Sequence, residues 1–189
     1  MTHPILAKLA LDTPIEVPLS QSIIAQTRKR VGFVPNMYVK MAHNPSLLEA
    51  YTQAYTTFRK LAGFNPIEQE VVLLSVAVAN TCGYCTAAHS FVAATMSNVP
   101  ADVIAALQSG TALPDPKLDA LSNLTRALTN NRGLVLQDDL DAFLAVGYTE
   151  AHVLGIITGI AVKTMSNYAN HLTQPAIDQV FASYAHRAE

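Results

Sequence analysis

Apolar residues recur three and four positions apart along most of the chain, the spacing that places them on one face of an α-helix. Two such faces are formed by Leu47, Leu48, Tyr51, Tyr55 and Phe58, and by Leu118, Leu121, Leu124 and Leu128. No stretch alternates apolar and polar residues as a half-buried strand does. The pattern therefore predicts an all-α protein of packed helices.

Capping residues, prolines and glycines divide this pattern into separate helices. The predicted helices cover residues 20–30, 37–42, 45–62, 66–79, 82–96, 100–109, 117–130, 137–146 and 150–172, and a last helix begins at Pro175. Their predicted N-caps include Ser20, Asn44, Asn65, Thr81 and Thr149. We expect residues 1–19 to be an N-terminal lead-in and residues 20–189 to form a single all-α domain.

The helix predicted over residues 66–79 is apolar on nearly every side, which is typical of a central helix. Without a break after it, Glu70 would lie roughly 18 Å from Cys82, because each helical residue advances 1.5 Å. We expect the helix to break at Asn80 and Thr81. Glu70 reaches the cysteines only if the chain bends there, or if a different subunit supplies it.

Composition bears on assembly and location. Half of the 189 residues are apolar and 14% are charged, which leaves more apolar surface than a monomer easily hides and predicts a homo-oligomer. A net charge of -2 gives no basic patch, and no nucleic-acid motif is present. The apolar runs 71–79 and 153–162 are too short to span a bilayer, and the first residues lack the pattern of a signal peptide. We expect a cytoplasmic protein without a membrane or nucleic-acid partner.

The two cysteines of the chain occur together as Cys82-x-x-Cys85, with His89 four residues later. On one helix these three residues lie at positions i, i+3 and i+7, which share a face. In a reducing compartment, a Cys-x-x-Cys pair is more often catalytic or metal-binding than a structural disulfide.

This spacing suits redox chemistry of a dithiol. A free cysteine has a pKa near 8.5, so only about three per cent is thiolate at neutral pH. The start of a helix stabilises the anion, and we expect Cys82 in the first turn with Cys85 at its end. His89 would accept a proton from Cys85, and Glu70 would orient His89 or pass the proton on through water. The second thiol would convert a sulfenic acid into a disulfide.

Other interpretations of these four residues stay open. One alternative is a zinc site, with Glu70, Cys82, Cys85 and His89 as its four ligands. Structural Cys-x-x-Cys zinc sites usually include a second such motif, however, and ligands on a single helix fit a tetrahedral geometry poorly. The cysteines could be inert core residues. Glu70 could be a solvated residue in the first turn of its helix, favoured there by the helix dipole.

A second polar cluster lies near the end of the last long predicted helix. Asn167, Asn170 and His171 are spaced i, i+3 and i+4. They are candidates for the lining of the dithiol pocket or for a subunit interface, with Tyr84 as a further pocket residue. The alternative is that they satisfy the carbonyl groups at the end of the helix.

The arrangement Glu70-x11-Cys82-x2-Cys85-x3-His89 resembles the motif of the alkylhydroperoxidase D-like branch of the carboxymuconolactone decarboxylase-like superfamily. Residues 31–36 and 163–171 look like its peroxidase-related members, and the likeness extends over roughly residues 20–185. The resemblance implies an oligomeric all-α fold and reduction of hydroperoxides without a bound cofactor. It also implies that Cys85 becomes the sulfenic acid, Cys82 donates a proton and resolves it, and Glu70 and His89 relay protons. The reductant would be a thioredoxin-like or dihydrolipoyl-bearing protein.

One position departs from the pattern of that family. Its best-described members have a histidine before the second cysteine, where this chain has Tyr84. A neutral phenol cannot relay protons at neutral pH as an imidazole can, but it can donate a hydrogen bond to a peroxide oxygen or a water. We expect a thiol-dependent peroxidase of antioxidant defence. The alternatives are a non-enzymatic redox sensor, a general disulfide oxidoreductase, a zinc-stabilised structural protein, and a decarboxylase, although decarboxylating members generally lack the cysteine pair.

Overall fold

The computed structural model describes residues 6–11 and 13–185 of the chain. This part contains helices and no strand, which confirms the predicted all-α class. The elements are α1 (Pro18–Val31), α2 (Asn36–Met41), α3 (Pro45–Leu61), α4 (Pro66–Ala79), α5 (Gly83–Thr95), α6 (Ala101–Ser109), α7 (Pro116–Asn130), α8 (Gln137–Ala145), α9 (Glu150–Thr173) and the 3₁₀ helix η1 (Gln179–Tyr184).

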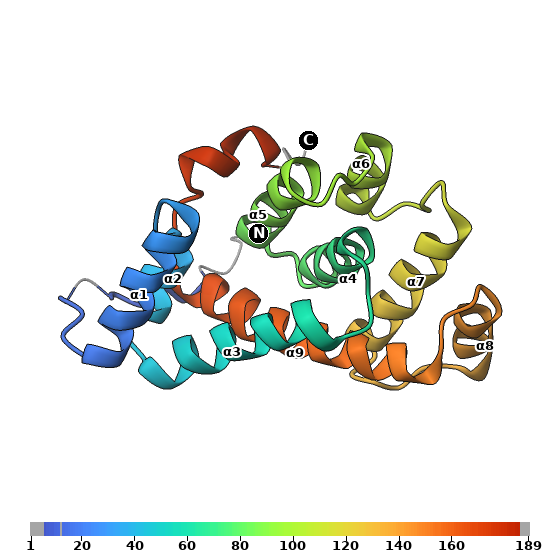
Figure 1. The fold of residues 1–189 in the computed structure, drawn as a ribbon, viewed down its shortest axis with the longest axis horizontal. Helices are drawn as coiled ribbons and strands as arrows, with labels where there is room; N and C mark the ends of the chain where they lie inside the picture. The colour runs from blue at the N-terminus through green and yellow to red at the C-terminus, as the bar shows by residue number, and fades with distance from the viewer. Residues whose placement is uncertain (1–5, 12, 186–189) are drawn as a thin grey trace, which may run out of the picture.

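Helix α4 lies in the middle of the molecule and packs against α5, α6, α7 and α9 (Figure 1). Its residues from Val71 to Leu74 are completely buried, as are Val76 and Ala77. Every side of the helix therefore faces protein, which confirms the central position that its apolar sequence predicts.

The long helix α9 approaches α3 and α4 closely because two of its residues are glycines. A Cβ atom at Gly155 would lie 2.5 Å from the carbonyl oxygen of Ala62. A Cβ atom at Gly159 would lie 2.7 Å from Val72 and 3.0 Å from Phe58. Both distances are too short for a side chain, so these glycines set how near α9 lies to the central helix and to the residues that α4 and α5 carry.

Two of the predicted caps hold the ends of the site-bearing helices. Asn44 accepts hydrogen bonds from the backbone of Ser46 and Leu47 at the start of α3. Asn65 and Glu68 form a capping box at the start of α4, each side chain accepting from the other residue's backbone N–H at 3.0 Å. These predictions are confirmed.

Three predicted boundaries are wrong. Helix α1 begins at Pro18 with Val17 as its N-cap, and Ser20 is buried inside it, because proline suits the first helical position. Thr81 adopts a left-handed conformation (φ 52°) and does not cap α5. Pro175 does not begin an α-helix, since Gln174 ends α9 in a left-handed conformation and only η1 follows.

Long-range contacts hold the chain where that last helix was predicted. The Asp178 carboxylate accepts hydrogen bonds from the backbone N–H of Asn36, at 3.2 Å, and from the hydroxyl of Tyr84. Contacts of this kind fix the backbone through residues far away in the sequence, and a local pattern does not contain them.

The predicted lead-in contacts the end of α9. The Leu9 backbone N–H donates to the carbonyl of Leu172 at 2.8 Å. Residues 1–5 and 12 of the lead-in lie outside the described residues, so the division of the chain at residue 19 stays a prediction.

Within the described residues, no single helix is both long and apolar enough to cross a bilayer. Helices α8 and α9 reach the required length and hydropathy only together, and they are bent by 111° where they join.

Candidate active site

The turn between α4 and α5 brings the predicted site residues together. Thr81 reverses the direction of the chain, and the Cys82 backbone N–H donates to the carbonyl of Ala77 at 2.9 Å. Helix α5 then packs along α4, and His89 Nδ1 lies 2.9 Å from Glu70 Oε2. The contact forms within one chain, so the bend that the sequence required is present and a second subunit is not needed to supply Glu70.

Both cysteines are buried and free, each with only 2% of its surface exposed. Cys82 is the N-cap of α5 rather than a residue of its first turn, which corrects the predicted position, and Cys85 is the third helical residue. From α9, Asn170 Nδ2 donates to Cys85 Sγ at 3.2 Å and lies 3.8 Å from Cys82 Sγ. Ser166 Oγ lies 3.8 Å from Cys85 Sγ.

The pKa values of the two thiols are shifted in opposite directions. A hydrogen bond from Cys82 holds the pKa of Cys85 well below its ordinary value despite burial, with further help from the positive charge of Lys163, from His89 and from Ser166. The same hydrogen bond and burial raise the pKa of Cys82. Cys85 is therefore the thiol of the pair that ionises first, and Cys82 is the one that keeps its proton longer.

Glu70 is completely buried between two basic groups. Its Oε2 contacts His89, and its Oε1 forms an ion pair with Arg59 of α3. Burial opposes ionisation of Glu70, but His89 and Arg59 hold its pKa below the ordinary value. Arg59 is itself fixed by donating to the Tyr55 hydroxyl at 2.6 Å and to Gln69 Oε1 at 3.1 Å.

His89 is held in the form that accepts protons. Burial and the charge of Lys163 lower its pKa, and Glu70 only partly offsets them. The imidazole is therefore neutral at neutral pH, and its Nδ1–H donates to the Glu70 carboxylate. The lone pair then lies on Nε2, which is the arrangement of a general base.

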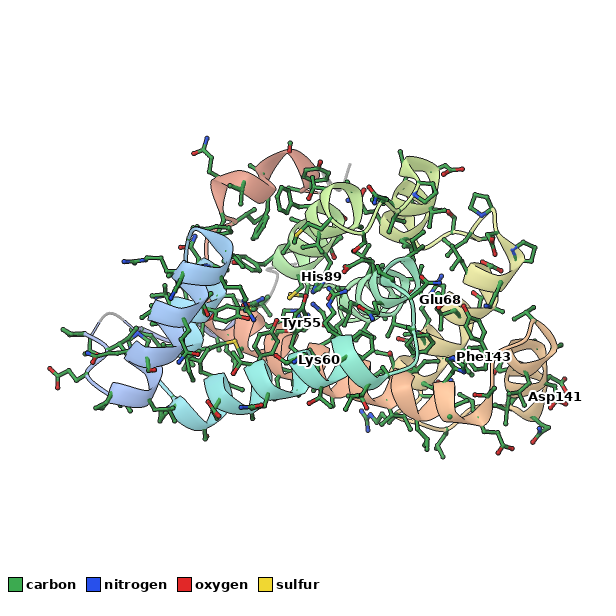
Figure 2. The ribbon with its side chains drawn as sticks, in the orientation of Figure 1. Tyr55, Lys60, Glu68, His89, Asp141 and Phe143 are labelled. Carbon is green, nitrogen blue, oxygen red and sulfur yellow. The ribbon has the colours of Figure 1, made fainter. Side chains whose placement is uncertain are left out.

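Aromatic rings from α2 and α3 extend from His89 as a row. Centroid distances are 6.3 Å between His89 and Tyr55, 5.9 Å between Tyr55 and Tyr51, and 5.7 Å between Tyr51 and Tyr38. Figure 2 shows Tyr55 and His89 together near the middle of the molecule. Burial raises the pKa of Tyr38 to about 12, so this phenol is neutral at physiological pH.

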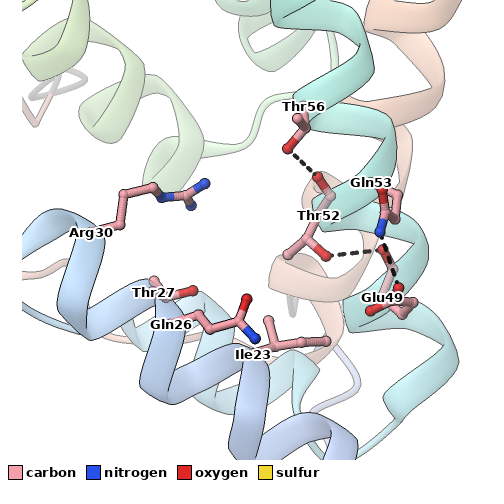
Figure 3. A pocket seen from close by; sticks show the side chains of 8 residues that line it. All are labelled: Ile23, Gln26, Thr27, Arg30, Glu49, Thr52, Gln53 and Thr56. Atoms are coloured by element: carbon pink, nitrogen blue, oxygen red, sulfur yellow. Dashed lines mark hydrogen bonds between the residues drawn. The ribbon is translucent and has the colours of Figure 1, made fainter.

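A polar pocket of about 370 Å³ opens between α1 and α3 (Figure 3). Ile23, Gln26, Thr27, Arg30, Glu49, Thr52, Gln53 and Thr56 line it. None of these is a predicted site residue, and neither cysteine reaches this pocket. The dithiol is thus enclosed by the helices and separate from the pocket.

The additional pocket residues predicted from the sequence have other contacts. The Tyr84 hydroxyl donates to Asp178 and accepts from the Met37 backbone at 3.3 Å, so the donor expected for a peroxide oxygen is already used. Asn167 accepts from the Asn80 side chain at 3.0 Å and thereby supports the turn before Cys82. His171 is exposed and stacks on Tyr168, outside the site.

Asn170, which the sequence marks as a candidate for the lining of the dithiol pocket, does contact both sulfurs. Two other residues, Lys163 and Arg59, were not singled out as functional from the sequence. Lys163 is completely buried, and its only sequence signal is a lone charge in a strongly apolar helix. Arg59 gives no signal, because a basic residue near the end of a helix is ordinary.

The geometry does not support the zinc alternative. Within the described residues, no group of three or more His, Cys, Asp and Glu side chains is arranged to hold a metal ion. Glu70 and His89 bond each other and Arg59, and the sulfurs face Asn170 and Ser166 instead.

Comparisons with known proteins agree with this fold. Residues 45–129, which include Glu70, both cysteines and His89, match the Carboxymuconolactone decarboxylase family. The chain is similar to a crystal structure of an alkylhydroperoxidase AhpD core, an uncharacterized peroxidase-related protein from Ralstonia eutropha JMP134. The TM-score is 0.79 and the identity is 21%, and the match covers 95% of this chain and 96% of that chain. An uncharacterized peroxidase-related protein from Silicibacter sp. TM1040 gives a TM-score of 0.77 and 22% identity, covering 96% of this chain and 97% of that one. The family match covers less than half of the chain, and the two solved structures share its fold.

Members of this fold differ in chemistry. The debrominase Bmp8, in a cysteine-to-alanine variant bound to 2,3,4-tribromopyrrole, is similar to this chain with a TM-score of 0.73 and 15% identity, over 96% of each chain. No curated protein matches the chain significantly. These likenesses show the fold, and the chemistry of this chain depends on the residues of its site.

Proposed function

We propose that this protein is a thiol-dependent peroxidase that reduces hydroperoxides through a Cys82–Cys85 dithiol/disulfide cycle. The observation that carries the proposal is one buried site in which Asn170 contacts both sulfurs and Glu70 orients His89. The pKa of Cys85 is lowered and that of Cys82 is raised, which supports Cys85 as the nucleophile and Cys82 as the proton donor. A nucleophile, a proton donor and a base are therefore present in one buried site.

In the first step, the Cys85 thiolate attacks the terminal oxygen of the hydroperoxide. A sulfur–oxygen bond forms, the oxygen–oxygen bond breaks, and the alkoxide leaves. The Cys82 thiol gives its proton to the alkoxide, which departs as an alcohol. Cys85 is then a sulfenic acid and Cys82 a thiolate.

In the second step, the Cys82 thiolate attacks the sulfur of the sulfenic acid. The disulfide forms and hydroxide leaves, taking a proton through His89 to become water. The net reaction converts one hydroperoxide and two thiols into an alcohol, water and a disulfide. Asn170 contacts both sulfurs and so holds them near one another for this step.

The cycle needs a reductant from outside, since the chain has no further cysteine. We assign this role to a dithiol protein of the thioredoxin-like or dihydrolipoyl-bearing type. The requirement for repeated reduction favours a cytoplasmic location, where dithiol systems keep thiols reduced.

We also propose a homo-oligomer. Large apolar side chains on the outer side of α9 are exposed, and a second copy would cover them. These are Leu154, Ile157, Tyr168 and Leu172.

The test is a single-turnover reaction of the reduced protein with an organic hydroperoxide, followed by intact mass and a free-thiol count. We expect the wild type to lose both thiols and two hydrogens. Cys82→Ser should stop at a sulfenic acid that dimedone traps, and Cys85→Ser should not react. If Cys85→Ser consumed peroxide as fast as the wild type, the protein would not be a peroxidase that depends on Cys85.

Two further outcomes separate the alternative functions. Oxidation to the disulfide without turnover in the presence of any dithiol reductant would indicate a redox sensor. If the protein did not react with hydroperoxides but debrominated 2,3,4-tribromopyrrole with the help of its thiols, it would be a debrominase, as Bmp8 is named.

A further inference from the structure

Lys163 is a buried cation without a visible partner. It lies in the middle of α9, its side chain is completely buried, and its Nζ makes no hydrogen bond to any residue that the structure describes. An isolated ammonium group in a protein interior is strongly unfavourable unless an opposite charge lies nearby. A negative charge close to this residue would offset that cost.

The surroundings of Lys163 indicate which charge this is. Lys163, Ser166 and Asn170 are spaced i, i+3 and i+7 on α9, so they share one face. Ser166 lies 3.8 Å from Cys85 Sγ, and Asn170 donates to that sulfur at 3.2 Å. The face that carries Lys163 is thus the face that contacts the dithiol.

The other anion of the region is already paired. Both oxygens of Glu70 have basic partners, since Oε2 contacts His89 and Oε1 contacts Arg59. The positive charge of Lys163 acts on the sulfurs, lowering the pKa of Cys85 and opposing the rise in that of Cys82. The Cys85 sulfur, which the same face of α9 contacts through Asn170, is therefore the candidate for a negative charge beside Lys163.

We propose that Lys163 is the countercharge of the Cys85 thiolate and that it makes the Cys82–Cys85 disulfide strongly oxidising. The proposal deepens the proposed function, on which it rests only in requiring that the two thiols form a disulfide. Lys163 acts through Cys85 and is a positioning residue rather than a catalytic one.

The reduced and the oxidised form of the cysteine pair differ in charge. Oxidation of the thiolate and the thiol forms the sulfur–sulfur bond, releases one proton and passes two electrons to an acceptor. The disulfide is neutral, so Lys163 loses its anion when the bond forms. This destabilises the oxidised state relative to the reduced state, which raises the reduction potential and makes the disulfide easy to reduce.

The test measures the redox equilibrium without peroxide. Full-length wild type and Lys163→Met would be equilibrated with buffers of reduced and oxidised glutathione, and the thiols trapped and counted by mass. Methionine keeps the length of the side chain and removes its charge. We expect the equilibrium of Lys163→Met to favour the disulfide at least tenfold more than that of the wild type, or about 30 mV.

Two control variants sharpen this result. Lys163→Arg keeps the charge, so its equilibrium should stay within about threefold of the wild type. Lys117→Met removes a half-exposed lysine that pairs with Glu68, and it should not change the equilibrium. An unchanged equilibrium in Lys163→Met, or a Lys117→Met shift of equal size, would overturn the proposal.

A second measurement needs no variant and so does not depend on whether Lys163→Met folds. The melting temperature of the wild type is compared between its reduced and its disulfide form. A disulfide normally stabilises a fold, but here we expect the oxidised protein to melt lower. An oxidised form as stable as the reduced form, or more stable, contradicts the proposal. A protein that shows the expected redox shift and the expected melting difference but does not react with hydroperoxides would refute only the peroxidase function.

Discussion

Two glutamates of α4, separated by one residue, have entirely different surroundings. Glu68 lies at the start of the helix, where it completes the capping box with Asn65 and accepts from the Tyr148 hydroxyl at 3.0 Å. Its cationic partner Lys117 lies 3.3 Å away with a side chain that is 48% exposed. Figure 2 shows Glu68 toward the side of the molecule that carries Phe143, away from His89.

Glu70 faces the other side of the same helix, because residues two apart point in nearly opposite directions. It is completely buried, and its partners are His89 and Arg59. The interactions of Glu68 hold helices together, whereas those of Glu70 orient a histidine near the cysteine pair. The comparison shows that the partners of the carboxylate, rather than the acid itself, distinguish a structural glutamate from one in a reactive site.

The largest expected effect separates the two glutamates by activity. Glu70→Gln removes the carboxylate that orients His89 and leaves Arg59 without its anion. We expect the rate of single-turnover thiol oxidation to fall roughly tenfold to a hundredfold, in the range of a general acid–base contribution. Stopped-flow measurements on protein shown by circular dichroism to be folded would measure it.

Glu68→Gln is the matched control. It makes the same chemical change two residues away, and glutamine still completes a capping box. Its rate should stay within about twofold of the wild type. Equal rates for the two variants would remove Glu70 from the proton relay.

The next effect concerns stability alone. Glu68→Ala loses the capping interaction and leaves the buried Tyr148 hydroxyl without its acceptor, so we expect a loss of about 1–2 kcal/mol in the free energy of unfolding. The ion pair with the half-exposed Lys117 should contribute little of this. Urea unfolding measures the loss, and a slower oxidation by this variant would show that the Glu68 region is coupled to the dithiol after all.

The smallest effect is a pH dependence. The pKa of His89 is below its ordinary value of about 6.5 in the folded state, so the unfolded chain binds a proton first as the pH falls. Stability is therefore full above about pH 6.5 and declines below it, with a slope of at most one proton from this group. Glu70, Arg59 and Lys163 are the charged groups that act on it.

The pH effect is isolated by difference. Urea unfolding of wild type and His89→Gln at pH 7.5 and 5.5 cancels the contributions of the other titrating groups. We expect the wild type to lose more stability over this interval than the variant. An equal or smaller loss in the wild type would mean that His89 is not held neutral by the fold.

The sequence predicted the helices well wherever the signal was local. The caps at Asn44 and Asn65 and the apolar surface of α4 specify their helices through neighbouring residues, and all three are confirmed. The boundaries at Ser20, Thr81 and Pro175 were wrong, because Pro18, a left-handed turn and the Asp178 contacts decide them. The same distinction holds in the site, where the role of Tyr84 in contacting Asp178 could not be read from its place between the cysteines.

The sequence by itself determined the helical class, the dithiol and its histidine, since each depends on residues within about seven positions of one another. Only the tertiary structure decided which groups surround them. Glu70 meets His89 because the turn at Thr81 folds α5 back on α4, and Lys163 and Asn170 join them because the two glycines of α9 let that helix approach. Charge in a protein interior acts through space, so the properties of Cys85 depend on residues as far as 85 positions away in the sequence.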